Sequence, residues 1–61
     1  METLNKFVVG VMAGDVVIVM PPRRLRPAEA MEFAAWLVCM AQTQDFKLEP
    51  FDKYLVAVRA S

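Results

Sequence analysis

The sequence predicts an α+β fold in the order β-β-α-β, with three antiparallel strands in one sheet and one helix packed on one face of it. Three observations support this prediction: two β-branched runs separated by a glycine-containing turn, a segment with apolar residues at helical spacing, and a β-prone segment near the end. We expect the 61 residues to form a single small domain that exists as an obligate homo-oligomer.

The first predicted element is a hairpin over about residues 7–20. Two apolar, β-branched runs at residues 7–12 and 16–20 flank Ala13, Gly14 and Asp15. A short connection that contains glycine is typical of a hairpin, because glycine adopts positive φ angles without steric cost. Neither face of the strands is polar. We therefore expect the helix to cover one face of the sheet and a second copy of the protein to cover the other.

An arginine- and proline-rich loop is predicted at residues 21–26, because proline cannot donate a hydrogen bond to a sheet. A helix follows over about residues 27–43, with Pro27 at its first position and Glu29 at its third. Arg26 falls at the cap position, where its side chain cannot accept a hydrogen bond from the free amides. Residues 53–59 are rich in β-prone side chains and predict the third strand, antiparallel to the first and placed beside it after a right-handed crossover.

The helical wheel separates an apolar side of the helix from a mixed stripe. The apolar side holds Ala30, Phe33, Ala34, Leu37, Val38 and Ala41. Trp36 falls in the stripe with Glu29 and Glu32, and Met40 lies at its edge. We expect Trp36 to be an interface anchor that another chain buries, and Tyr54 to pack on the sheet. The alternative for both rings is a stacking platform for a base or an arginine.

Composition excludes several classes of function. Seven Lys and Arg residues balance seven Asp and Glu residues, which excludes a generally basic nucleic-acid coat and an acidic mimic of DNA. Histidine is absent and Cys39 is the single cysteine, so we predict no metal, no cofactor, no disulfide within the chain and no enzymatic activity. A hydrophobic fraction of 57% exceeds what one small core buries, and a homodimer or higher oligomer is the expected solution.

The predicted compartment is the cytoplasm. Residues 1–6 lack the pattern of a signal peptide, and no apolar segment approaches the roughly 20 residues of a membrane span. An unpaired cysteine fits a reducing interior. We therefore expect no membrane partner.

Three stretches in the middle of the chain carry a resemblance to known proteins: Val9 to Pro22, Leu25 to Ala30, and Phe33 to Val38. This half of the chain resembles very short proteins encoded by bacteriophages and prophages, most of which lack an assigned function. The resemblance implies an accessory protein that binds and disables a host component in the host cytoplasm. Some such proteins sequester nucleotide-derived immune signals as oligomers. The resemblance carries no site residues, and Arg26 stands where a serine or threonine is expected before the proline.

The candidate ligand site is the cluster of Arg23, Arg24 and Arg26 just before the helix. Guanidinium groups beside the free amides of a helix start suit a phosphate or carboxylate. The alternative is a solvated loop whose arginines pair with Glu29 and Glu32.

Two functions follow from these residues, and both are binding functions. The first is a non-catalytic oligomer that sequesters an anionic, nucleotide-like signalling ligand at subunit junctions, as in phage anti-defence. The alternative is an inhibitor or adaptor that docks on a host protein through Trp36 and its apolar neighbours. Nucleic acid ranks last as a partner, because a neutral chain with one cluster of three arginines makes few phosphate contacts.

Overall fold

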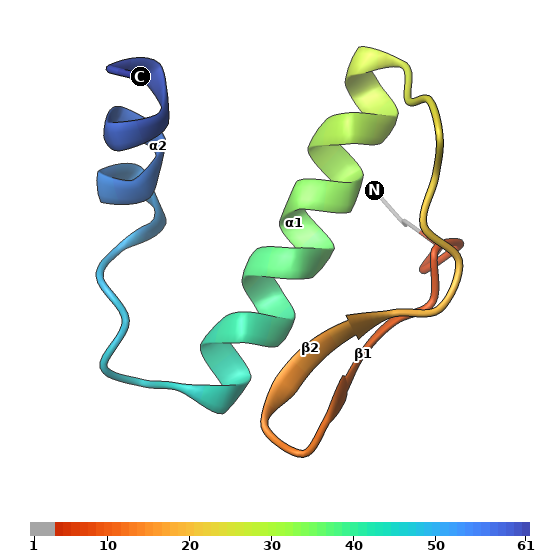
Figure 1. Ribbon diagram of the computed structural model, residues 1–61, viewed down its shortest axis with the longest axis horizontal. Helices are drawn as coiled ribbons and strands as arrows, with labels where there is room; N and C mark the ends of the chain where they lie inside the picture. The colour runs from red at the N-terminus through yellow and green to blue at the C-terminus, as the bar shows by residue number, and fades with distance from the viewer. Residues whose placement is uncertain (1–3) are drawn as a thin grey trace.

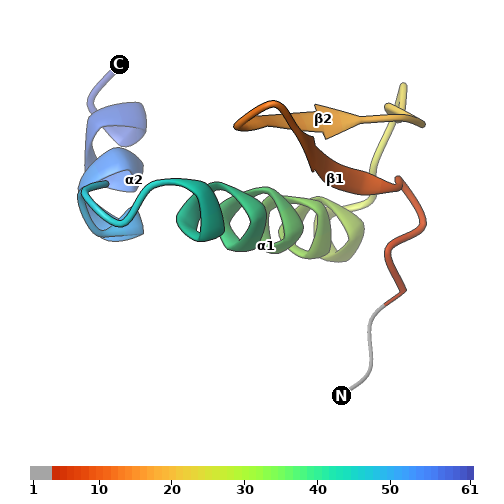
Figure 2. The ribbon, with the colours of Figure 1, turned by 90° about the horizontal axis from the view of Figure 1, so that it is seen from below.

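The computed structural model describes residues 4–61 and contains two strands followed by two helices. The elements are β1 (Val9–Met12), β2 (Asp15–Ile18), α1 (Pro27–Gln44) and α2 (Phe51–Arg59). β1 and β2 form a two-stranded antiparallel sheet that lies against one side of α1, and α2 lies beyond the other side of α1 (Figures 1 and 2). The fold is α+β, but the predicted β-β-α-β order with a three-stranded sheet and one helix is wrong. The expectation about a signal peptide concerned residues 1–6, of which 1–3 lie outside the described residues.

A two-residue turn joins the strands. Ala13 and Gly14 have φ angles of 53° and 85°, the combination found in a type I′ turn, whose twist suits a hairpin. Asp15, which we expected in the turn, instead begins β2 and pairs with Met12. The remaining pairs are Val11 with Val16, Gly10 with Val17, and Val9 with Ile18.

The hairpin is held on α1 by one aromatic contact and one ion pair. Phe7 is 8% exposed, and its ring meets that of Phe33 nearly edge-on, with ring centroids 4.8 Å apart and planes 67° apart. Lys6 Nζ lies 3.1 Å from Glu29 Oε2. Because Glu29 and Phe33 are four residues apart on α1, both lie on the same side of the helix. The hairpin therefore covers this side.

Asn5 shapes the chain where it enters β1. The backbone N–H of Val8 donates to Asn5 O at 3.0 Å, and the N–H of Val9 donates to Asn5 Oδ1 at 2.9 Å. Asn5 Nδ2 donates in turn to Val9 O at 2.8 Å. Val8 has a φ angle of 51°, which is rare for a β-branched residue. The three hydrogen bonds around Asn5 support this unfavourable conformation.

The start of α1 is stabilised by half of a capping box. Arg26 occupies the N-cap position, and Pro27 follows it. Glu29 Oε1 accepts a hydrogen bond from the backbone N–H of Arg26 at 3.3 Å, whereas the guanidinium of Arg26 has no acceptor to offer. The helix ends at Gln44, and the N–H of Asp45 closes the last turn on Ala41 O at 3.2 Å.

The predicted third strand over residues 53–59 is wrong, because this segment belongs to α2. Pro50 occupies the N-cap position of the helix, Asp52 lies in its first turn and Arg59 in its last, where each charge suits the helix dipole. The apolar side chains recur at helical spacing: Phe51, Tyr54, Leu55 and Val58. This period of 3.6 residues prevails over the β-propensity of the individual residues.

We expect Phe7→Ala to lower the free energy of unfolding by about 3 kcal/mol, because it removes the ring that seats the hairpin on α1. Phe46 is 93% exposed, and Phe46→Ala is expected to change the free energy by less than about 0.5 kcal/mol. Urea unfolding followed by circular dichroism measures both variants. Equal losses would contradict the packing described above.

Candidate functional site

The loop at residues 21–26 joins β2 to the start of α1 and presents three arginines. The side chains of Arg23, Arg24 and Arg26 are exposed, and Leu25 between them is half-buried. Among residues 4–61 the ion pairs are Lys6–Glu29 and Lys53–Glu49, so none of these arginines forms an ion pair with a described carboxylate, although the charge of Arg26 helps to lower the pKa of Glu29. We call this cluster of three arginines the Arg loop. Its positive charge faces solvent.

The N-terminus of α1 already holds a carboxylate of the chain itself. The hydrogen bond from Lys6 and the bond from the backbone N–H of Arg26 hold the pKa of Glu29 below its ordinary value of 4.5. A carboxylate in the first turn also satisfies the helix dipole. An external anion therefore gains less from the helix start than the sequence led us to expect. The guanidinium groups of the Arg loop are the remaining positive charges that could attract an external anion.

Trp36 lies on the hairpin side of α1 rather than on an outward stripe. It follows Phe33 by three residues and Glu29 by seven, which places all three on one side of the helix. Its side chain is half-buried, and Nε1 is buried without a hydrogen-bond partner among the described residues. The hairpin lies on the side of α1 that carries Glu29, whereas Cys39, in the same predicted stripe, is exposed. Met40, one turn further on, is also half-buried.

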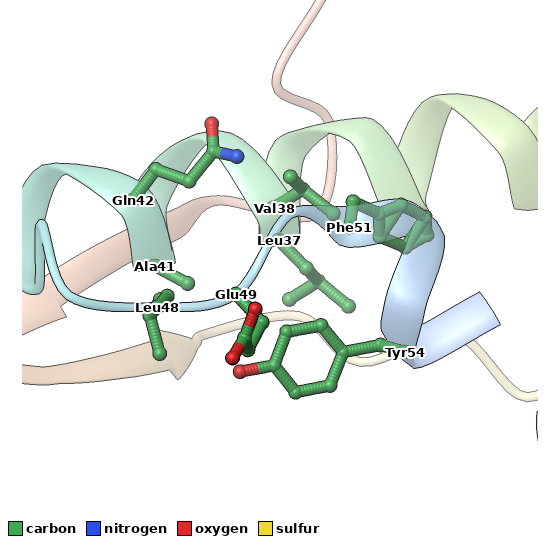
Figure 3. Close-up of a pocket in the computed structure, with 8 residues that line it drawn as sticks. All are labelled: Leu37, Val38, Ala41, Gln42, Leu48, Glu49, Phe51 and Tyr54. Atoms are coloured by element: carbon green, nitrogen blue, oxygen red, sulfur yellow. The ribbon is translucent and has the colours of Figure 1, made fainter. Parts of the chain in front are cut away.

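A groove of about 350 Å³ lies between α1 and the segment that leads into α2 (Figure 3). Tyr54 and Glu49 both line this groove. The groove is otherwise mostly apolar, and its further lining residues are Leu37, Val38, Ala41, Gln42, Leu48 and Phe51. We did not predict this group, because a strand at residues 53–59 would lie in the sheet beside the first strand, whereas α2 lies away from the sheet. The helical spacing of the apolar residues after Pro50 was the signal that could have revealed it.

The predicted site residues fall into three separate places. The Arg loop lies on one side of α1. The helix α2, which carries Tyr54, lies on the other side (Figures 1 and 2). Trp36 lies in the middle of α1, on the side that carries Phe33 and Glu29. Within one chain, therefore, no aromatic residue of the prediction lies beside the arginines to stack a base that they hold.

Within the described part of the chain, no three His, Cys, Asp or Glu side chains gather as metal ligands, and no helix is long and apolar enough to cross a membrane. Cys39 is an exposed free thiol in the middle of α1. The chain matches no protein-family model, no curated protein and no solved structure.

The ion pair of Glu29 predicts a pH dependence. Because the pKa of Glu29 is lowered in the folded state, its contribution to stability is present above pH 4.5 and is lost as the pH falls through the folded-state pKa. We expect Glu29→Gln to be less stable than the wild type at pH 7, and the difference to shrink as the pH falls below 4.5. Urea unfolding at several pH values measures this.

Glu32→Gln is the control, because it removes one carboxylate from the same helix and Glu32 makes no ion pair among the described residues. A pH-dependent loss of the same size in Glu32→Gln would show that net charge, rather than the bond to Lys6, is responsible.

Proposed function

We propose that this protein is a small, non-catalytic binding protein that works as a homo-oligomer. The observation that carries the proposal is the exposed surface of 5394 Å². A compact monomer of 6.9 kDa exposes about 4,000 Å², so the excess is about 1,400 Å². Obligate dimers bury about 2,000–5,000 Å² over both partners, and the excess is what one subunit contributes to such an interface.

The chemistry of the surface supports the same proposal. Fourteen large hydrophobic side chains are exposed, against two that are buried in residues 4–61. The exposed ones are Leu4, Val8, Val11, Met12, Ile18, Val19, Met20, Met31, Phe46, Leu48, Phe51, Tyr54, Val56 and Val58. Apolar surface on this scale is typical of an interface. The radius of gyration of 12.4 Å, against about 10.5 Å for a compact domain of this length, describes a chain that has not closed on itself.

The ligand of the proposed oligomer is an anionic, nucleotide-like molecule bound by the Arg loop. Three exposed guanidinium groups without a described carboxylate partner suit phosphate oxygens, which they bind through charge-assisted hydrogen bonds. Prolines on both sides restrict the loop and reduce the entropy lost on binding. Since Trp36 and Tyr54 lie away from this loop within one chain, we assign the rest of the pocket to a subunit junction. Sequestering such a signal in the host cytoplasm is the anti-defence role implied by the phage resemblance.

Docking on a host protein is the second candidate function. Its support is the apolar groove between α1 and α2, which lies open beside Tyr54. Trp36 contributes less than we expected, because its indole N–H is buried under the hairpin.

Native mass spectrometry of protein purified gently from bacterial cells tests the proposal. We expect a multiple of the 6.9 kDa chain that carries extra mass of a few hundred daltons for each site. The double variant Arg23→Ala/Arg24→Ala is expected to lose the extra mass and keep the multimer, because the ligand contacts the arginines and the interface is apolar.

The matched control is Lys47→Ala/Arg59→Ala, which removes the same charge from exposed positions outside the Arg loop and is expected to keep the ligand. Extra mass that persists in Arg23→Ala/Arg24→Ala would overturn the ligand site. A monomeric wild type would overturn the oligomer. A clean multimer without added mass would favour the host-protein function.

A further inference from the structure

The backbone of the hairpin distinguishes its two outer edges. In an antiparallel pair, hydrogen-bonded and non-hydrogen-bonded residue pairs alternate. The type I′ turn makes Met12–Asp15 a hydrogen-bonded pair. Four residues before Met12, the bond from the Val19 N–H to Val8 O at 3.2 Å makes Val8–Val19 a hydrogen-bonded pair as well, as the alternation requires. The residues between these pairs turn their N–H and C=O groups away from the partner strand. They are Val9 and Val11 on β1, and Val16 and Ile18 on β2.

The outer edge of β1 is closed at Val9. The side-chain amide of Asn5 accepts from the Val9 N–H at 2.9 Å and donates to Val9 O at 2.8 Å. These are the two hydrogen bonds that a neighbouring strand would make with Val9. The N-terminal segment also leaves the sheet along the β1 side (Figure 2). A further strand therefore cannot pair along β1 without displacing Asn5.

The outer edge of β2 has no such cover. No side chain among residues 4–61 bonds to the outward groups of Val16 or Ile18. β2 contains no lysine, proline or bulge, which protect an edge strand from pairing, and its one charged residue, Asp15, lies at its first position. An isolated two-stranded sheet is only marginally stable, and further strands stabilise it.

We propose that β2 pairs edge to edge with β2 of a second copy of this chain, which gives a continuous four-stranded antiparallel sheet. This inference rests on the proposed self-association and assigns its surface. A two-fold axis passes beside Val17, so that Val17 lies opposite the partner's Val17 and Val16 lies opposite the partner's Ile18. Two-fold symmetry makes such a contact closed and self-complementary.

This register satisfies the outward groups of both strands. Val16 and the partner's Ile18 form a hydrogen-bonded pair, and the symmetric pair repeats it, so four backbone hydrogen bonds form across the edge. The central cross-strand pairs, Val16 with the partner's Ile18 and Val17 with the partner's Val17, are all β-branched, and no like charges oppose each other.

The same register keeps the faces of the two hairpins consistent. Val16 and Ile18 share the face of β1 that carries the buried Val9, so the two copies of α1 lie on one side of the new sheet. Val17 lies on the other face, opposite Gly10. A Cβ added to Gly10 would meet no atom within 4 Å, so this face of the sheet is open beside Val17. The β2 edge therefore suits a second copy because its own sequence is complementary to itself around Val17.

Disulfide trapping tests the register directly. In a Cys39→Ala background, Val17→Cys places two thiols opposite each other on the axis. The Cα atoms of a non-hydrogen-bonded antiparallel pair lie about 4.5 Å apart, within the span of a disulfide. We expect mild oxidation with glutathione disulfide to convert most of this variant into a dimer on a non-reducing gel.

Val11→Cys on the outer edge of β1 and Val19→Cys, which lies opposite the partner's Asp15 in this register, are the controls in the same background. We expect both to form at least about tenfold less dimer, because neither residue meets its own copy at the axis.

A charge exchange at the same position gives an independent test. Val17→Lys and Val17→Glu each place like charges across the axis, and each is expected to weaken dimerisation at least about tenfold. Mixing the two variants is expected to restore the dimer. Met12→Lys, on the same face but away from the axis, is expected to leave dimerisation unchanged. Sedimentation velocity gives the masses, and circular dichroism shows whether each variant is folded.

The outcomes separate the two proposals. A monomeric wild type overturns both. An oligomeric wild type in which Val17→Cys cross-links no more than Val11→Cys overturns the edge pairing and leaves self-association in place. If Val17→Cys does not fold, the charge exchange decides: failure of the mixture to dimerise overturns the edge pairing, and recovery of the dimer supports it.

Discussion

The contact between Phe7 and Phe33 is the interaction on which the other features of the molecule depend, because it seats the hairpin on one side of α1. It brings Lys6 to Glu29, so the start of α1 holds a carboxylate of its own chain. It also places the hairpin over the side of α1 that bears Trp36. The remaining sides of α1 are then available to α2 and to solvent, which gives the chain three separate surfaces rather than one site.

A chain of this size cannot cover an apolar helix and an apolar hairpin at once. The hairpin covers one side of α1 and an open groove separates another side from α2, so most of the chain's large hydrophobic side chains stay exposed. A second copy of the chain can cover this apolar surface, because identical chains offer identical unpaired strand edges that can pair with each other.

The difference between the two sheet edges shows how local hydrogen bonding can direct assembly. Asn5 satisfies the outward backbone of Val9, and the unusual φ angle of Val8 belongs to the same turn. β2 ends without an equivalent device. One polar side chain thus closes one edge of the hairpin and leaves the other available. Sequence reasoning assigned Asn5 no role, because its function depends on the turn that brings it beside the strand.

Local signals in the sequence determined the hairpin turn around Gly14, the helix start at Pro27 and the apolar character of both strand faces. Residues 53–59 were misassigned because β-propensity and helical spacing compete there, and the helical spacing of the apolar residues prevails. The position of Trp36, by contrast, was decided by tertiary structure. A helical wheel shows which residues share a side of a helix, but not which side the hairpin will cover. That choice depends on long-range contacts between Phe7 and Phe33, which no local pattern contains.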